Sequence, residues 1–359
     1  MIDYLMNSLI SALPAGFLGF FALIVIIALS LLVLSKGADI LVDEAVLLSE
    51  RWGVPKMIIG ATIVSLGTTL PEATVSVMSA LKGAPGLAMG NAVGSIICDT
   101  GLILGIAALI KPLPFKKEVI NRQGWIQLGA GVLLVATSFA FGQGLSVFKE
   151  GSVIPQFMGW VFLGLLLFYI IRTIQLARKS SGLPVSNVQD EDTLEQDENS
   201  GVKSNEPTVI ILLKLILGIA LVILSSKILI PAVQETAIRF HIPENIIAAT
   251  LVAFGTSLPE LTTAIASSRK GHGDLAIGNV MGADILNVLF VVGAAASVTP
   301  QGLSVQVSFF RLLFPAMLFV LCVFKGAVLF SKNTLKRSVG IVLLGSYVTV
   351  TILSYVTGF

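Results

Sequence analysis

Charged side chains are scarce in this chain, and long apolar runs take their place. Of its 359 residues only 12% are charged, whereas 55% are hydrophobic and the mean hydropathy is +0.93. Such a composition excludes an ordinary soluble domain. Apolar runs long enough to cross a bilayer as helices recur along the sequence. We therefore predict a multi-pass protein of the cytoplasmic (inner) membrane, with the lipid bilayer as its surroundings.

Cysteine and histidine are rarer still. Cys98 and Cys322 each lie inside an apolar run, which excludes a disulfide framework and a cysteine-based metal motif. His241 and His272 are too few and too far apart for a zinc site. Without Ser-His or His-rich motifs the chain is not expected to be an enzyme or to hold a cofactor. The net charge of +2 indicates neither a nucleic acid nor a protein partner.

Ten apolar segments have the length of membrane-spanning helices, so we predict an all-α integral membrane protein. They cover residues 17–47, 54–81, 86–110, 124–142, 156–177, 208–238, 243–268, 274–298, 306–326 and 337–356. The first lacks the basic start of a signal peptide and is interpreted as a retained helix. Spans 1 and 6 exceed the ~30 Å hydrocarbon core and should tilt or extend into the interface.

Lysine and arginine alternate between the connections. Those after spans 1, 3, 5, 7 and 9 hold 15 of these residues, and the others hold three. The positive-inside rule therefore predicts both termini outside and the odd-numbered connections in the cytoplasm. Residues 178–207, the one long hydrophilic stretch, carry an acidic run without the glycine and spacing of an EF-hand loop. We interpret them as a solvated cytoplasmic linker between halves 1–177 and 208–359.

Residues 51–105 are repeated in residues 239–293 at a constant offset of 188, with 23 of 55 positions identical. Each copy carries Gly-Thr-Thr/Ser-Leu-Pro-Glu, ending at Glu72 or Glu260, and then Gly-Asn-x-x-Gly-Ser/Ala. A buried carboxylate in lipid is costly, so two at equivalent positions call for a partner, most simply a shared cation. An odd number of spans separates the copies, which predicts two inverted five-helix repeats that build one site between them.

Pro71 is predicted to break the second span in mid-membrane, because proline removes a backbone donor and clashes with the preceding turn. The freed carbonyls around Gly67 then lie beside the Thr69 hydroxyl and the Glu72 carboxylate. The second copy has the same parts: Gly255, Thr256, Ser257, Pro259 and Glu260. Pooled, these hard oxygen ligands suit calcium or sodium and not a soft metal.

A further polar side chain follows each glutamate by 27 residues, Asp99 in the first copy and Asn287 in the second. The Gly-Asn pairs at 90–91 and 278–279 are expected to break or closely pack the third and eighth helices. Helix packing in lipid explains the glycines. It does not explain the acids inside apolar spans, which are Glu72, Asp99, Glu260 and Asp284.

These doubled motifs resemble the two alpha-repeats of the cation/calcium exchanger superfamily, in particular prokaryotic sodium/calcium exchangers. The resemblance is sharp over the two repeats and covers all ten spans in layout. It implies antiport of calcium against a monovalent cation by alternating access, in which two long tilted helices slide over a core of eight. Spans 1 and 6 match those two helices in length and place.

The resemblance also implies a ligand set. Glu72 and Glu260 would bind calcium together with two backbone carbonyls. The two flanking positions would take monovalent cations, and Asp99 and Asn287 would line the middle position. The remaining implied ligands are the carbonyls of Thr68, Thr256, Ala253 and Ser65, the hydroxyls of Thr69, Ser95 and Ser257, and the side chains of Asp99 and Asn287.

Two departures from the family pattern stand out. Asp99 and Asn287 are exchanged between the repeats, a swap that a pseudo-two-fold axis tolerates. Ala283 removes a hydroxyl, and Asp284 stands beside it where an asparagine is usual. A step of one residue turns a helix by about 100°, so Asp284 is not a direct replacement. We hypothesise that Asp284 faces an aqueous vestibule and tunes ion entry.

Two counter-ions are compatible with the sequence. Sodium needs neutral oxygens, and three hydroxyls remain for it. Protons are the alternative, because carboxylates crowded in a low-dielectric site repel one another, so one of them takes up a proton when calcium leaves. A cation channel usually needs an oligomeric ring, whereas these repeats close a site in one chain. An intramembrane enzyme would need a dyad that Glu-Pro pairs do not resemble. Calcium/sodium exchange is therefore the favoured function.

Overall fold

The computed structural model describes residues 8–10, 12–14, 16–142, 144–181, 206–240, 255–331 and 333–356. Eight of the described helices are long and apolar enough to cross a membrane, and one bent pair makes a ninth. The helical segments are α2 Phe17–Trp52, α3 Lys56–Ile59, η1 Gly60–Val64, α4 Ser65–Thr68, α5 Leu70–Leu81, α6 Pro85–Ile97, η2 Cys98–Ile103, α7 Leu104–Ile110, α8 Lys117–Ala140, η3 Gly144–Ser146, α9 Val147–Glu150, α10 Gln156–Ser181, α11 Thr208–Arg239, α14 Leu258–Arg269, α15 Gly273–Leu286, η5 Asn287–Val292, α16 Gly293–Ser297, η6 Phe309–Leu313, α17 Phe314–Phe330 and α18 Arg337–Val356. The predicted all-helical class is therefore confirmed in its main features.

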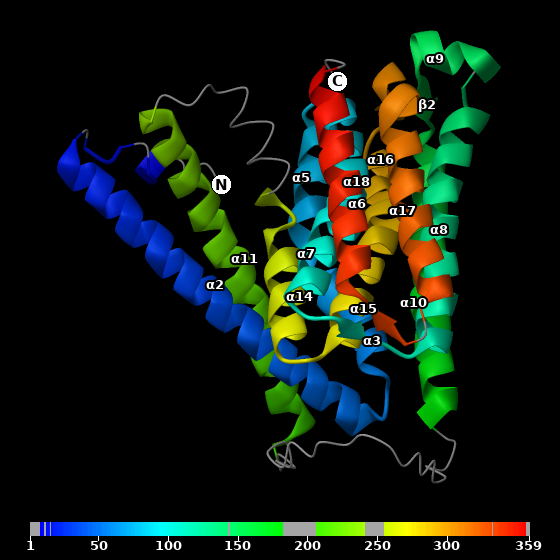
Figure 1. Ribbon diagram of the computed structural model, residues 1–359. Helices are drawn as coiled ribbons and strands as arrows, with labels where there is room; N and C mark the ends of the chain where they lie inside the picture. The colour runs from blue at the N-terminus through cyan, green and yellow to red at the C-terminus, as the bar shows by residue number, and fades with distance from the viewer. Residues whose placement is uncertain are drawn as a thin grey trace.

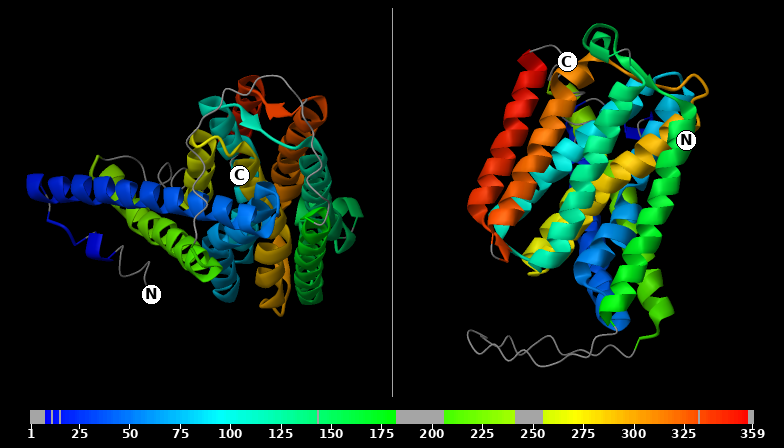
Figure 2. Two further views of the ribbon diagram at one scale, coloured as in Figure 1. Left: turned by 90° about the horizontal axis from the view of Figure 1, so that it is seen from below. Right: turned by 90° about the vertical axis from the view of Figure 1, so that its right-hand side faces the viewer.

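Two long helices, α2 and α11, lie side by side and lean away from the rest of the bundle (Figures 1 and 2). They have 36 and 32 residues, as the long first and sixth spans predicted. Their contact depends on glycine: a Cβ at Gly37 would lie 2.9 Å from the Leu221 side chain, and one at Gly218 would lie 2.8 Å from the Leu41 nitrogen. Small residues of this kind let helix backbones approach in lipid.

The predicted break in the second span is present. Segments α3, η1 and α4 lead to Thr69, and α5 continues after a bend of 44°. Pro71 lies in the first turn of α5, where a proline without an N–H is tolerated. In the second copy, α14 begins at Leu258 after the non-helical Ser257, whereas residues 241–254 lie outside the described part of the chain.

The predicted breaks in the third and eighth helices are wrong. Residues Pro85–Ile110 and Gly273–Ser297 each run as one helix that passes without a gap through its Gly-Asn pair. What interrupts the α-helical pattern is a π-helical turn, η2 in the first and η5 in the second. A π turn inserts one residue and rotates the following side chains without freeing a run of backbone groups.

Helix α15 is the centre of the core. Within the most apolar stretch of the span Gly273–Ser297, which α15 begins, 94% of residues are buried, compared with 22% for α2. It crosses the bent helix so closely that a Cβ at Gly282 would lie 2.5 Å from the Ala61 Cα, and one at Gly278 would lie 2.3 Å from the Met57 carbonyl oxygen. The repeat glycines therefore set this crossing, as the packing interpretation expected for Gly282.

Helices α8, α10, α17 and α18 complete the bundle, on the side away from α2 (Figure 1). Helix α8 begins at Lys117, seven residues before the predicted span, because its early polar residues face partners inside the protein. One of them, Gln123, donates a hydrogen bond to Tyr169. Four very short strands join the connections: β1 Leu113–Pro114 pairs with β4 Thr334–Leu335, and β2 Ser152–Ile154 pairs with β3 Leu303–Val305.

Candidate functional site

The two repeat glutamates occupy equivalent places in the structure. Glu72 lies in the first turn of α5 and Glu260 in the first turn of α14, and each side chain is 1% exposed. In both cases the Pro-Glu pair starts a helix, so that the glutamate lies near the positive end of the helix dipole. Glu72 is close enough to Glu260 and Asp99 to interact with both electrostatically. The repeat thus places Glu72 within electrostatic range of two other buried carboxylates.

Hydroxyls predicted as ligands connect the two copies. Thr69, at the bend of the first copy, donates a hydrogen bond to Oε1 of Glu260 at 3.3 Å. The Ser257 hydroxyl of the second copy lies 3.4 Å from that of Ser95 in the first. All of these side chains are buried. Each copy therefore lends a hydroxyl to the other, as a site shared between two repeats requires.

Two asparagines connect the copies a second time. The Thr68 hydroxyl donates to Oδ1 of Asn279 at 3.5 Å, and the Thr256 hydroxyl donates to Oδ1 of Asn91 at 3.3 Å. These are equivalent pairs, since the offset of 188 converts one into the other. Asn91 also donates to the Glu72 carbonyl at 3.2 Å. Sequence reasoning assigned these asparagines only to helix shape, although an asparagine inside an apolar span is itself a signal of a buried polar contact.

Asp99 and Asn287, the predicted middle ligands, lie at the starts of the two π turns. Asp99 is the second residue of η2, and Asn287 is the first residue of η5. Both are 1% exposed. Asp99 interacts electrostatically with Glu260. π turns occur frequently at functional sites because they turn a side chain out of the regular helical register. Here they hold the carboxylate and the amide in corresponding positions of the two copies.

Several buried oxygens of this region have no hydrogen-bond partner among the residues that the structure describes. They are both carboxylate oxygens of Glu72, Oε2 of Glu260 and Oδ1 of Asp99, Asp284 and Asn287. In the described part of the chain no lysine or arginine pairs with these acids. Unpaired buried carboxylates are costly in lipid, and a cation is the partner that satisfies them.

The donor set suits a transported ion better than a resident metal. Among the described residues no three His, Cys, Asp or Glu side chains gather to hold a metal ion. The two glutamates therefore need hydroxyl and carbonyl oxygens as co-ligands. Ser65 and Thr68 of the first copy are fully buried, whereas Ala253 lies outside the described residues. Mixed neutral and charged oxygens are the ligands that calcium and sodium accept.

The hypothesis that Asp284 faces an aqueous vestibule is wrong for this structure. Its side chain is 2% exposed. Oδ2 accepts hydrogen bonds from the Thr100 hydroxyl and, at 2.5 Å, from Nε2 of Gln127. The helical rotation that separates Asp284 from Ala283 turns it toward α8, as the angle of about 100° implies. Gln127 escaped sequence analysis because it lies outside the repeated block.

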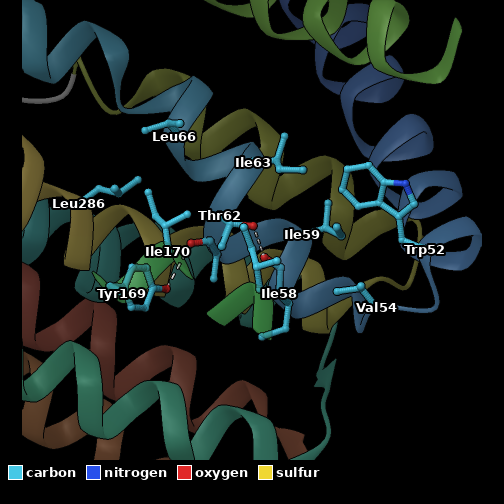
Figure 3. A pocket seen from close by; sticks show the side chains of 12 residues that line it. Trp52, Val54, Ile58, Ile59, Thr62, Ile63, Leu66, Tyr169, Ile170 and Leu286 are labelled. Carbon is cyan, nitrogen blue, oxygen red and sulfur yellow. Dashed lines mark hydrogen bonds between the residues drawn. The ribbon is translucent and has the colours of Figure 1, made fainter. Parts of the chain in front are cut away.

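Of the cavities that border the bent helix in the described part of the chain, two bear on the location of the cation site. One, of about 480 Å³, is apolar and lies between α3, η1 and α10; its lining includes Ile58, Tyr169 and Leu286 but no carboxylate (Figure 3). It is therefore not the cation site. The other, of about 290 Å³, lies between α5, α11 and the start of α14, and it reaches Thr256 beside the repeat motif.

His272 lies in the connection between α14 and α15, at the helix N-cap. Nζ of Lys56 lies 3.3 Å from its Nδ1. Burial, and secondly the Lys56 charge, lower the pKa of His272 below its ordinary value. The equivalent position in the first copy is Ala84, which caps α6 in a similar conformation. This histidine is therefore a difference between the copies and not a part of the cation site.

Bent membrane-length helices around buried, unpaired carboxylates define a multi-pass membrane transporter for cations. The family comparison then makes the class specific. The model of the family described as "Sodium/calcium exchanger protein" matches residues 22–175 and 210–356. The chain belongs to the sodium/calcium exchanger protein family, and the predicted resemblance to cation/calcium exchangers is confirmed. Family members are transporters, which also confirms that the chain is not an enzyme; it is a cation/calcium antiporter.

Individual relatives agree. The chain is 35% identical to the inner membrane protein YrbG of Escherichia coli over 277 residues, 77% of this chain and 79% of that one. It is 29% identical to the sodium/calcium exchanger MaX1 of Methanosarcina acetivorans, over 79% of this chain and 85% of that one. A solved structure of the sodium-calcium exchanger NCX_Mj, soaked with 10 mM Na⁺ and zero Ca²⁺, shares the fold with a TM-score of 0.73 and 24% identity, covering 92% of this chain and 98% of that chain.

Proposed function

We propose that this antiporter exchanges calcium for sodium, with both ions bound between the two copies of the repeat. The observation that carries the proposal is the hydrogen bond from Thr69 of one copy to Glu260 of the other, beside carboxylate oxygens that have no partner. Calcium bound there would satisfy Glu72 and Glu260 together. Sodium would use the same acids with the hydroxyls of Thr69, Ser95 and Ser257.

The ten-helix inverted arrangement belongs to the same proposal. The equivalent Thr–Asn pairs support it, because a two-fold operation exchanges them. The short strands support it as well: β1 and β3 follow equivalent helices, so pairing β1 with β4 and β3 with β2 is the same contact made at opposite ends of the bundle. The halves would be residues 1–177 and 208–359, joined by a cytoplasmic linker at 178–207.

Alternating access would come from a movement of α2 and α11 against the core. In the present structure the cavity that reaches Thr256 is lined by the second half of α11, which ends at the same side as the C-terminus (Figure 1). With both termini outside, this cavity would admit ions from outside. At the opposite end Lys270, which follows α14, pairs with Asp43 of α2 at 2.8 Å and with Asp39 at 3.4 Å, which holds that side together.

Proton coupling is the second candidate, because Ala283 supplies no hydroxyl where Ser95 supplies one in the other copy. A site with one neutral oxygen fewer holds sodium less well. Its crowded carboxylates could instead exchange calcium for protons. One uptake experiment distinguishes sodium coupling from proton coupling.

The test is calcium-45 uptake by proteoliposomes that contain the purified protein. One set is loaded with sodium and diluted into sodium-free medium, and another carries an outward proton gradient. We expect uptake to follow the sodium gradient and to disappear in Glu260→Gln. Uptake driven only by protons would contradict sodium coupling, and uptake driven by neither gradient would contradict the assignment of calcium as substrate.

A further inference from the structure

One buried carboxylate of the core, that of Asp284, lies outside the ligand set described above. Asp284 projects from α15 toward two other helices, and its partners are Thr100 on η2 and Gln127 on α8. Nε2 of Gln127 also lies 3.1 Å from the Thr100 hydroxyl, so the three side chains form a closed triangle. All three are at most 3% exposed.

The two carboxylate oxygens of Asp284 differ in their hydrogen bonding. Oδ2 accepts hydrogen bonds from both Thr100 and Gln127, whereas Oδ1 is buried and has no partner in the described part of the chain. Both oxygens of a carboxylate can accept, so Oδ1 remains available to a further partner. Carboxylates that bind cations are commonly fixed in this way, with outer hydrogen bonds that hold the group and a free oxygen that faces the ion.

Two neighbours of Asp284 also carry an oxygen without a hydrogen-bond partner among the described residues. Asp284 interacts electrostatically with Asp99, whose Oδ1 is also free. Asn287 stands three residues after Asp284 on the same helix face, with its own Oδ1 unpartnered. In the described chain no lysine or arginine pairs with Asp284. Oδ1 of Asp284 is thus a buried acceptor without a partner among the described residues, within electrostatic range of Asp99, and a cation would satisfy it.

We propose that Asp284 is an additional cation ligand, positioned by Gln127 and Thr100, and that it forms a subsite for a monovalent metal cation beside Asp99. We assign it a monovalent cation because Asp284 adds a single unpartnered carboxylate oxygen, whereas calcium takes six to eight oxygens with several charges among them. It rests on the proposed exchange of calcium for sodium and adds a binding position to it. Gln127 is its positioning residue and belongs to α8, which lies outside the repeated blocks 51–105 and 239–293.

The experiment compares Asp284→Asn and Gln127→Leu with wild type in the sodium-loaded proteoliposomes. The sodium concentration for half-maximal uptake should rise about tenfold in Asp284→Asn and by a smaller factor in Gln127→Leu. The Hill coefficient for sodium should fall, since it is limited by the number of sodium sites. The half-saturating calcium concentration should stay within about twofold of wild type, and Asp284→Glu should recover part of the sodium affinity.

Gln123→Leu is the matched control. Gln123 lies one turn before Gln127 on α8 and is equally buried, but it donates to Tyr169. The Tyr169 hydroxyl keeps an acceptor without it, since it also donates to the Ala61 carbonyl at 3.4 Å. Sodium dependence in this variant should equal that of wild type. A sodium response in Asp284→Asn equal to wild type, or equal losses of sodium and calcium affinity, would overturn the proposal.

A second measurement is independent of transport. The unfolding temperature of the purified protein should rise with added sodium chloride, relative to choline chloride, more in wild type than in Asp284→Asn, because bound sodium stabilises the folded state. An equal rise in both proteins would overturn the subsite. A larger rise in wild type without sodium-driven uptake would support the subsite and contradict the proposed sodium coupling.

Discussion

In the first copy of the repeat, α6 carries Ser95 and a buried Ile96, whereas in the second copy α15 carries Ala283 and a buried Asp284. By contrast, each copy donates a threonine hydroxyl to the equivalent asparagine of the other copy. The comparison teaches that the contacts which join the repeats are kept, while the ligands around them differ. A site that pools both copies tolerates this, because what matters is the combined set of oxygens.

The largest effect should come from the glutamates that both copies share. Glu72→Gln and Glu260→Gln should each lower calcium uptake by at least about 100-fold, because a calcium site loses a charged ligand. Glu44→Gln is the control: Glu44 is also buried in a membrane helix, but it pairs with Lys214 at 3.7 Å. Uptake near wild type in either repeat variant would contradict the shared site.

The Thr–Asn pairs should respond symmetrically. Asn91→Ala and Asn279→Ala should each reduce uptake about tenfold, since each leaves a threonine hydroxyl of the shared site without its partner in the other copy. Thr74→Val is the control, because the Thr74 hydroxyl bonds only within its own helix, to Leu70 at 2.8 Å. A strong loss in one asparagine variant and none in the other would break the two-fold relation.

The missing hydroxyl can be restored. Ala283→Ser should lower the sodium concentration for half-maximal uptake about threefold to fivefold, the effect of roughly 1 kcal/mol from one added neutral ligand. Ser95→Ala should raise it by a similar factor. Sodium titrations of calcium-45 uptake measure both. Opposite shifts of this concentration in the two variants would show that positions 95 and 283 have equivalent roles. An unchanged value in both variants would contradict the assignment of these hydroxyls as sodium ligands.

The smallest effect concerns His272, which replaces Ala84 of the first copy. Its lowered pKa means that, below about pH 6.5, the unfolded chain binds a proton that the folded protein resists. Stability should therefore fall as the pH drops through this range. His272→Ala should reduce that fall, by less than about 3 °C in unfolding temperature. A pH dependence equal to wild type between pH 5 and 7 would show that His272 contributes nothing.

The sequence predicted the elements whose cause is local. The bend at Thr69 follows from Pro71, and the length of α2 follows from its apolar run. The continuity of the third and eighth helices could not be predicted, because neighbouring helices decide whether a Gly-Asn pair bends or packs. Gln127 was missed for a similar reason. Its role depends on α8 meeting Asp284 of α15, a tertiary contact that no spacing along the chain encodes.

The inverted two-fold relation between the copies is the central claim, and exchanging their unlike ligands tests it most directly. Asp99→Asn and Asn287→Asp should each lower sodium-driven calcium uptake about tenfold or more. The double variant returns the carboxylate and the amide to the pooled set in exchanged positions, so uptake should recover to within about threefold of wild type. A double variant as inactive as the product of the two single losses would contradict a site shared between equivalent copies.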